Sequence, residues 1–85
     1  MQAQGIPQQG ALGRAVREVR ARRGWSQEHL GERAGLHRTY VGALERGLLN
    51  PTLRTLLALT DGLMVPMSEL VEVYERQLAD AAHAR

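Results

Sequence analysis

A twenty-residue segment, residues 27–46, constrains the fold most, because its glycines and apolar residues suit two short helices that cross closely. Gly35 separates two apolar runs and can adopt the left-handed backbone conformation that ends a helix. Gly31 provides a small residue where two helix backbones can meet. The apolar positions expected to face a core are Leu30, Ala34, Leu36, Val41 and Leu44. The segment therefore predicts a helix-turn-helix, with an α-hairpin inside a generic helical bundle as the alternative.

Apolar residues at helical spacing on both sides of this segment predict three more helices. The expected helix starts are Ala11, Ser26 as the cap of the second helix, Arg38, Thr52 as the cap of the fourth, and Pro66 or Ser68. The expected ends are Gly24, Gly35, Gly47 and the pair Asp61–Gly62. No segment shows the alternating pattern of a strand, so the sequence predicts an all-α fold of five helices.

These helices predict one domain over residues 11–79. Residues 1–10 are rich in Gln and Gly and have little to bury, so they are expected to form a disordered tail, and residues 80–85 a flexible one. No apolar run approaches about 18 residues, so we expect no membrane contact. Cysteine is absent, which fits a reducing compartment, and we expect a cytoplasmic protein.

Charge is divided unevenly along the chain. Residues 1–50 hold eight arginines against four glutamates, a net charge of +4, whereas residues 51–85 hold three arginines against five acidic residues, a net charge of −2. A basic first half favours a polyanionic partner. All eleven basic residues are arginine, the better side chain for forked contacts to phosphate and guanine, although a GC-rich genome would produce the same bias.

Three stretches carry a family resemblance: GWSQEHLGERAGL, HRTYVGALERG and NPTLRTLLAL. With them, residues 12–70 resemble the Cro/C1-type, or XRE, family of helix-turn-helix regulators, and the motif is closest to the controller proteins of restriction–modification systems. The apolar pair Leu48–Leu49 departs from those controllers, which often carry a polar or charged residue there. The resemblance implies a lambda-repressor-like domain and a transcription regulator, either a repressor or a controller, that binds double-stranded DNA.

In a helix-turn-helix, the second helix of the motif enters the major groove with its N-terminal residues nearest the bases. The side chains expected to read bases are His37, Arg38, Thr39 and Ala43. Arg38 can hydrogen-bond both O6 and N7 of guanine. Thr39 can donate or accept a hydrogen bond at a base, and the small Ala43 allows a close approach of the helix.

Four further residues are expected at the DNA backbone: Gln27, Tyr40, Arg46 and Asn50. Gln27 begins the first helix of the motif, where free backbone N–H groups favour a phosphate, and the resemblance implies that its side chain takes part. For Tyr40 the alternative is packing between helices. For Arg46 it is a solvated charge that interacts with the helix dipole.

The resemblance also implies an ion pair between Arg20 and Glu45. Because a carboxylate near DNA is unfavourable unless it is neutralised, we interpret Glu45 as structural rather than base-reading. Trp25 is expected to fill a gap in the core, and Arg22 and Arg23 to be solvated.

The last third of the chain contains more apolar residues than a three-helix core needs. One recognition helix reads only a few base pairs, so we expect a homodimer on a palindromic operator. The expected dimer stripe, at helical spacing, is Leu70, Val71, Tyr74 and Leu78. The alternative is a monomer with a frayed C-terminal tail.

The three histidines are far apart in sequence and lack clustered partners, so no metal site is expected. No arrangement of a nucleophile and a base suggests an enzyme, and we expect no cofactor and no small-molecule ligand. Two other functions stay open at this point. One is an antitoxin whose main partner is a toxin protein, and the other is an α-helical interaction module without a DNA function.

Overall fold

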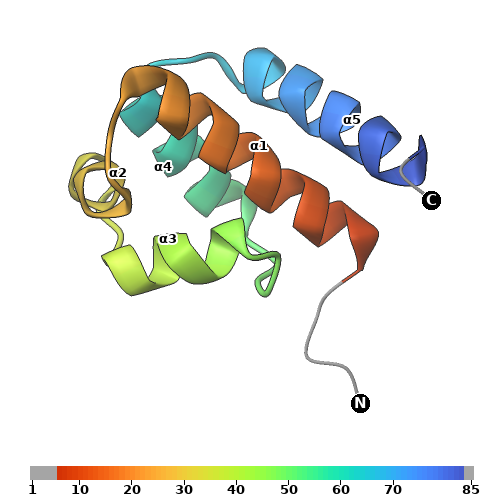
Figure 1. The fold of residues 1–85 in the computed structure, drawn as a ribbon. Helices are drawn as coiled ribbons and strands as arrows, with labels where there is room; N and C mark the ends of the chain where they lie inside the picture. The colour runs from red at the N-terminus through yellow and green to blue at the C-terminus, as the bar shows by residue number, and fades with distance from the viewer. Residues whose placement is uncertain (1–5, 84–85) are drawn as a thin grey trace.

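The computed structural model describes residues 6–83, which form five α-helices and contain no strand (Figure 1). The helices are α1 (Pro7–Arg23), α2 (Gln27–Ala34), α3 (Arg38–Glu45), α4 (Leu53–Leu63) and α5 (Met67–His83). The expected all-α fold of five helices is confirmed for this part of the chain.

Helix α1 lies between α5 on one side and α3 on the other, and α5 runs alongside it (Figure 1). The largest fully buried side chains are Leu30, Leu44, Leu59, Leu63, Leu70, Val16, Val19 and Val41. Burial of each such side chain contributes roughly 1.5–3 kcal/mol, so this core holds the five helices in one arrangement. Helix α3 packs on α1 and α2 through one face, which leaves its outer face open to solvent.

Several helix ends follow directly from the local sequence. The Ser26 hydroxyl oxygen accepts a hydrogen bond from the His29 N–H at 2.9 Å, and the Thr52 hydroxyl oxygen accepts one from the Thr55 N–H at 3.1 Å. These contacts satisfy donors that the first turn of a helix leaves unpaired. Gly35 ends α2 in the left-handed region, with φ at 72°. The predicted caps of α2 and α4 are therefore confirmed.

Helix α1 begins at Pro7 instead of the predicted Ala11, so the expectation of disorder is wrong for residues 7–10. Proline suits the first helical position because its φ is fixed near the helical value and it has no N–H to satisfy. The Gln9 side-chain oxygen also accepts the Ile6 N–H at 2.9 Å and closes the first turn. Residues 1–5 of the expected tail lie outside the described residues.

Helix α4 continues through the predicted stop at Asp61–Gly62 and ends at Leu63, with Met64 in the left-handed conformation. Gly62 is a packing residue rather than a terminator, because a Cβ atom there would lie 3.2 Å from the backbone nitrogen of Ala34 on α2. The helix end is held by Arg23, whose Nε donates to the Leu63 carbonyl at 3.0 Å. The expectation that Arg23 is merely solvated is therefore wrong.

Helix α5 starts directly after Pro66, whose carbonyl accepts the Glu69 N–H at 3.0 Å. It runs to His83, so residues 80–83 are helical, and the expected flexible tail is wrong for them. The run Ala-Asp-Ala-Ala at residues 79–82 contains good helix formers, which explains the extension. Residues 84–85 lie outside the described part. None of the described helices has the length and apolar character needed to cross a membrane.

Candidate nucleic-acid interface

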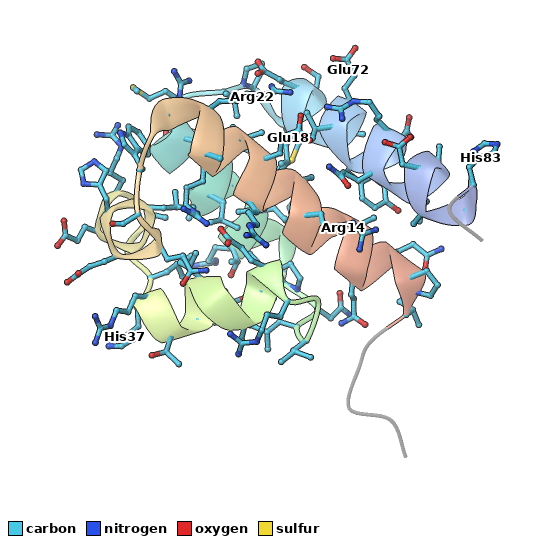
Figure 2. The ribbon with its side chains drawn as sticks, in the orientation of Figure 1. Arg14, Glu18, Arg22, His37, Glu72 and His83 are labelled. Atoms are coloured by element: carbon cyan, nitrogen blue, oxygen red, sulfur yellow. The ribbon has the colours of Figure 1, made fainter. Side chains whose placement is uncertain are left out.

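Helix α3 has one buried face and one free face. Val41 and Leu44 are completely buried against α1 and α2, whereas His37, Arg38 and Thr39 at its N-terminal end are exposed. Figure 2 shows His37 at this outer end, away from the body of the molecule. The three predicted base-reading side chains at the start of α3 therefore lie on one free surface, while Ala43 is half-buried one turn further on.

The start of α3 is organised by His37, which was predicted only as a DNA contact. His37 is the N-cap residue, and its Nδ1 accepts the Thr39 backbone N–H at 3.0 Å. Next to it, Arg38 Nη1 lies 4.0 Å from Glu28 Oε1 on α2, a separation at the limit of an ion pair between two exposed side chains. Such a pair restrains Arg38 only weakly.

Glu45, at the other end of α3, connects three segments of the chain. Arg20 on α1 donates from Nε to Oε2 at 2.7 Å and from Nη2 to Oε1 at 2.9 Å, while its Nη1 donates to the Trp25 carbonyl at 2.7 Å. Gln27 on α2 donates from Nε2 to Glu45 Oε1 at 3.0 Å. The hydrogen bonds that Arg20 donates to the Glu45 carboxylate raise the pKa of the Arg20 guanidinium above its usual value. The ion pair that the resemblance implied is thus present, and the additional link to Gln27 was not predicted.

Gln27 and Arg46 meet over the backbone of α3 at Gly42. A Cβ atom on Gly42 would lie 3.3 Å from Gln27 Oε1 and 3.4 Å from Arg46 Nη1. The carboxamide at the start of α2 and the guanidinium at the end of α3 therefore both approach the same point on the backbone of α3. This brings two of the predicted phosphate-binding side chains to one place.

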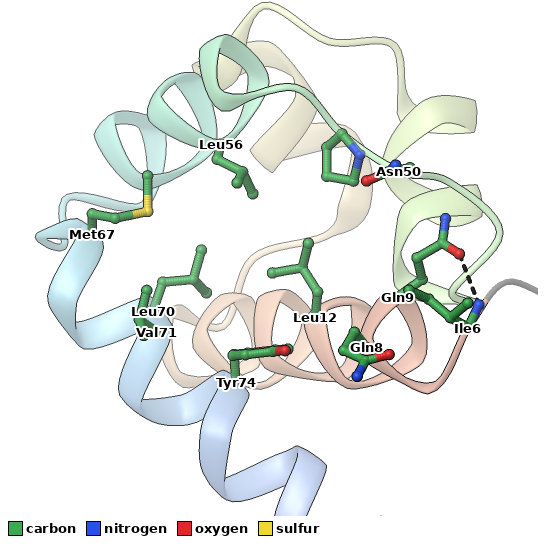
Figure 3. A pocket seen from close by; sticks show the side chains of 11 residues that line it. Ile6, Gln8, Gln9, Leu12, Asn50, Leu56, Met67, Leu70, Val71 and Tyr74 are labelled. Carbon is green, nitrogen blue, oxygen red and sulfur yellow. Dashed lines mark hydrogen bonds between the residues drawn. The ribbon is translucent and has the colours of Figure 1, made fainter.

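The other two predicted phosphate contacts are placed differently. Tyr40 is half-buried and packs against the core, as the alternative interpretation expected. Asn50 is exposed in the loop after α3, where it borders an apolar groove of about 270 Å³ between α1, α4 and α5 (Figure 3). Trp25 is half-buried, packs against the core and carries the Arg33 guanidinium 4.8 Å from its ring centre.

The predicted dimer stripe on α5 is only partly available at the surface. Leu70 is 1% exposed and belongs to the core, so its assignment to a free face is wrong. Val71 is 41% exposed, and Tyr74 and Leu78 are half-buried. The spacing of these residues did identify an apolar stripe, but α1 covers part of it. Sequence reasoning missed exposed apolar residues on α4, where Leu53 and Leu57 stand one turn apart.

A polar network holds α5 against α1 on the side away from α3 (Figure 2). Glu18 accepts hydrogen bonds from Arg76 at 2.6 Å and from Gln77 at 2.8 Å, both on α5, and from Arg22 on its own helix at 2.5 Å. The Arg76 contact and the two others lower the pKa of Glu18 to about 2.

Between residues 6 and 83, no three His, Asp or Glu side chains gather as ligands for a metal ion.

Comparison with known proteins adds to this geometry. The family model described as a helix-turn-helix domain matches residues 11–73, most of the chain. The chain belongs to the helix-turn-helix domain family. The helix-turn-helix predicted from residues 27–46 is therefore confirmed, and the motif comprises α2, the turn at Gly35 and α3.

Among curated relatives of this helix-turn-helix protein, the control protein C.SmaI of Serratia marcescens is 43% identical over 60 residues, 71% of each chain. The HTH-type transcriptional regulator SutR of Escherichia coli is 35% identical over 60 residues, and the match spans only about a third (34%) of SutR. The crystal structure of the restriction-modification controller protein C.AhdI from Aeromonas hydrophila superposes with a TM-score of 0.75 at 38% identity. That match covers 76% of this chain and 98% of C.AhdI. The predicted likeness to controller proteins is confirmed.

Proposed function

We propose that this protein is a transcription regulator that binds double-stranded DNA in a sequence-specific manner, with α3 in the major groove. The observation that carries the proposal is the free face of α3. Its opposite face is fixed in the core, while His37, Arg38 and Thr39 project at the end that would approach the bases. The relatives named as transcriptional regulators and control proteins support this assignment.

Each exposed group has a role that its chemistry suits. Arg38 donates two hydrogen bonds to guanine O6 and N7, and Thr39 contacts an adjacent base through its hydroxyl or its methyl group. Ala43 allows the helix to lie close to the base edges. Gln27 and Arg46, which both approach Gly42, hold the register of the helix by binding phosphate oxygens. The ring of Tyr40 packs on the core, and we propose that its hydroxyl group still donates a hydrogen bond to the DNA backbone, as does the side chain of the exposed Asn50.

The Arg20 side chain makes this surface compatible with DNA. A free carboxylate at the end of the recognition helix would repel phosphates, but both oxygens of Glu45 accept hydrogen bonds from the Arg20 guanidinium. The neutralised carboxylate also accepts a hydrogen bond from one N–H of the Gln27 carboxamide and so holds that side chain in place. The second N–H of that carboxamide remains for a phosphate oxygen. Glu45 therefore orders the contact surface without touching DNA.

A second copy of the chain would complete the specificity of the proposed regulator. One recognition helix reads too few base pairs for a unique site, and a two-fold dimer places two such helices about 34 Å apart on one face of the duplex. The dimer surface that we propose comprises exposed or half-buried apolar residues of α4 and α5: Leu53, Leu57, Met67, Val71 and Tyr74. Met67 connects the α4 part of this surface to the α5 part, because it lines one hollow together with Leu57 and another together with Val71.

Selection of binding sites from a pool of random duplex DNA tests the proposed function. We expect a near-palindromic site with half-sites about 10 base pairs apart, centre to centre. Affinity for this site should fall steeply between roughly 50 and 200 mM salt, because arginine–phosphate contacts release counterions. A pool that gains no sequence preference, or an affinity that does not change with salt, would rule out a sequence-specific DNA regulator.

A further inference from the structure

Helix α1 carries a polar link on each of two opposite sides. Glu18 faces α5 and accepts hydrogen bonds from Arg76 at 2.6 Å and from Gln77 at 2.8 Å. Arg20 faces α3 and pairs with Glu45 at 2.7 Å. Side chains two positions apart on a helix point about 200° away from each other, so the two links leave the same turn of α1 in nearly opposite directions. The proposed recognition helix and α5 are therefore both linked to one turn of α1.

The link to α5 is a network rather than a single ion pair. Arg76 donates from Nη1 to Glu18 Oε1 at 3.3 Å and from Nη2 to Oε2 at 2.6 Å. Gln77 donates to the same carboxylate, and its own Oε1 accepts the Nε–H of Arg14 on α1 at 3.2 Å. A forked arginine–carboxylate pair within a network is the arrangement in which charges near the surface have a measurable effect, and the fork also fixes the orientation of its two partners.

This network holds the half of α5 that has no buried residue. The buried residues of α5, Leu70 and Val73, both lie in its first half. From residue 74 to the end of the helix, every side chain is half-buried or exposed. Arg76 lies in this second half and joins it to Glu18. The angle at which α5 lies on α1 therefore depends on the network as well as on the core.

The proposed dimer surface depends on that angle because it spans two helices. Leu53 and Leu57 belong to α4, whereas Val71 and Tyr74 belong to α5. Helix α5 packs mainly against α1 and only lightly against α4. A change in the tilt of α5 therefore changes the shape of the composite surface, and with it the distance between the recognition helices of the two copies.

We propose that Glu18 is a positioning residue that determines the spacing of the two half-sites: by linking α5 to α1, it fixes the distance between the two recognition helices of the dimer. The inference rests on the proposed function and on the dimer surface of α4 and α5. One base pair corresponds to about 3.4 Å along the duplex, so a shift of that size between the recognition helices changes the preferred spacing by one base pair. With the network intact, the dimer selects one spacing, and without it the dimer also accepts the neighbouring ones.

The distance between the recognition helices can be measured without DNA. The chain has no cysteine, so Thr39→Cys allows one spin label to be attached to α3 of each protomer. In pulsed double electron–electron resonance on the full chain, we expect one narrow distribution of label distances. Adding Glu18→Ala should broaden it by roughly 3 Å or more. An equally narrow distribution at the same distance would overturn the inference, as would a labelled chain that forms no dimer.

Site selection tests the consequence for the operator. Glu18→Ala removes the centre of the network, whereas Arg76→Ala removes only a half-exposed partner and keeps the core intact. Both variants should select the wild-type half-site sequence but accept spacings one base pair shorter and longer, with roughly a 2- to 5-fold weaker affinity for the wild-type site. If Glu18→Ala does not fold, Arg76→Ala decides.

Glu75→Ala is the matched control. It removes the same charge as Glu18→Ala, from an exposed position on the same half of α5 that forms no ion pair with any residue between 6 and 83. We expect this variant to select the wild-type sequence at the single wild-type spacing. A change of spacing as large as that of Glu18→Ala would assign the effect to charge alone and overturn the inference.

Two further outcomes would overturn the inference while the proposed function stands. One is that Glu18→Ala and Arg76→Ala both select the single wild-type spacing. The other is that both sediment as monomers, which would show that the network holds the dimer together rather than determining its geometry. A wild-type chain that selects no sequence would overturn the proposed function and the effect on half-site spacing with it. The label distances would then still show whether Glu18 fixes the geometry of the dimer.

Discussion

Replacing Glu45 by alanine tests the structural core of the interface. The Glu45 side chain is 4% exposed and that of Arg20 is 15% exposed, so the substitution leaves a nearly buried guanidinium with the Trp25 carbonyl as its main partner. Loss of one partner of a buried ion pair costs about 3–5 kcal/mol. We expect the lower end, about 3 kcal/mol, because Arg20 keeps one hydrogen bond and some contact with water.

For a domain of this size, that loss lowers the melting temperature by roughly 12–24 °C. Thermal unfolding followed by circular dichroism measures it directly. The matched control is the double variant Arg20→Met/Glu45→Leu, which removes both charges and should recover much of the stability, since no charge is left buried without a partner. If Glu45→Ala melts within about 2 °C of wild type, Glu45 does not link α1 to α3 as described.

Three further predictions concern DNA contact, assembly and pH. Arg38→Ala should cost about 1–3 kcal/mol on the selected site and much less on random DNA, whereas Arg46→Ala should weaken both alike in fluorescence titrations. Val71→Glu should yield a folded monomer in sedimentation experiments, whereas Leu70→Glu should unfold the domain, because only the second residue lies in the core. The pKa of Glu18 is lowered to about 2 from its usual 4.5, so its contribution to stability is complete above about pH 4.5 and is lost as the pH falls through 2. The free energy of unfolding of wild type, measured with urea, should therefore exceed that of Glu18→Gln by about 1 kcal/mol at neutral pH, and the difference should vanish as the pH falls below about 2.

Features that depend on neighbours in the sequence were mostly predicted well, except for the start of α1 at Pro7 and the end of α5 at His83. Ser26 and Thr52 cap helices because their hydroxyl groups reach N–H groups three residues away, and Gly35 ends α2 because it can adopt a positive φ. The apolar spacing of residues 27–46 was likewise enough to predict the helix-turn-helix. Its two helices lie next to each other in the chain, and its core positions fall within twenty residues.

Features that depend on distant parts of the chain were predicted poorly. Gly62 was interpreted as a helix end because the sequence does not show that it packs on Ala34 of α2. The α5 stripe was found, but periodicity does not say which residues α1 covers, and Leu70 was misplaced for that reason. The hydrogen bond from Gln27 to Glu45 joins residues 18 positions apart, and no local pattern indicates it.

The central claim, that the free face of α3 binds DNA, is tested most directly by mapping amide chemical shifts in NMR spectra as a duplex carrying the selected site is added to the ¹⁵N-labelled chain. We predict that the largest changes fall on residues 37–43 and on Gln27 at the start of α2. The amides of α5 that face away from α3 should change least upon binding. Changes concentrated on α4 and α5, with residues 37–43 unaffected, would contradict the claim.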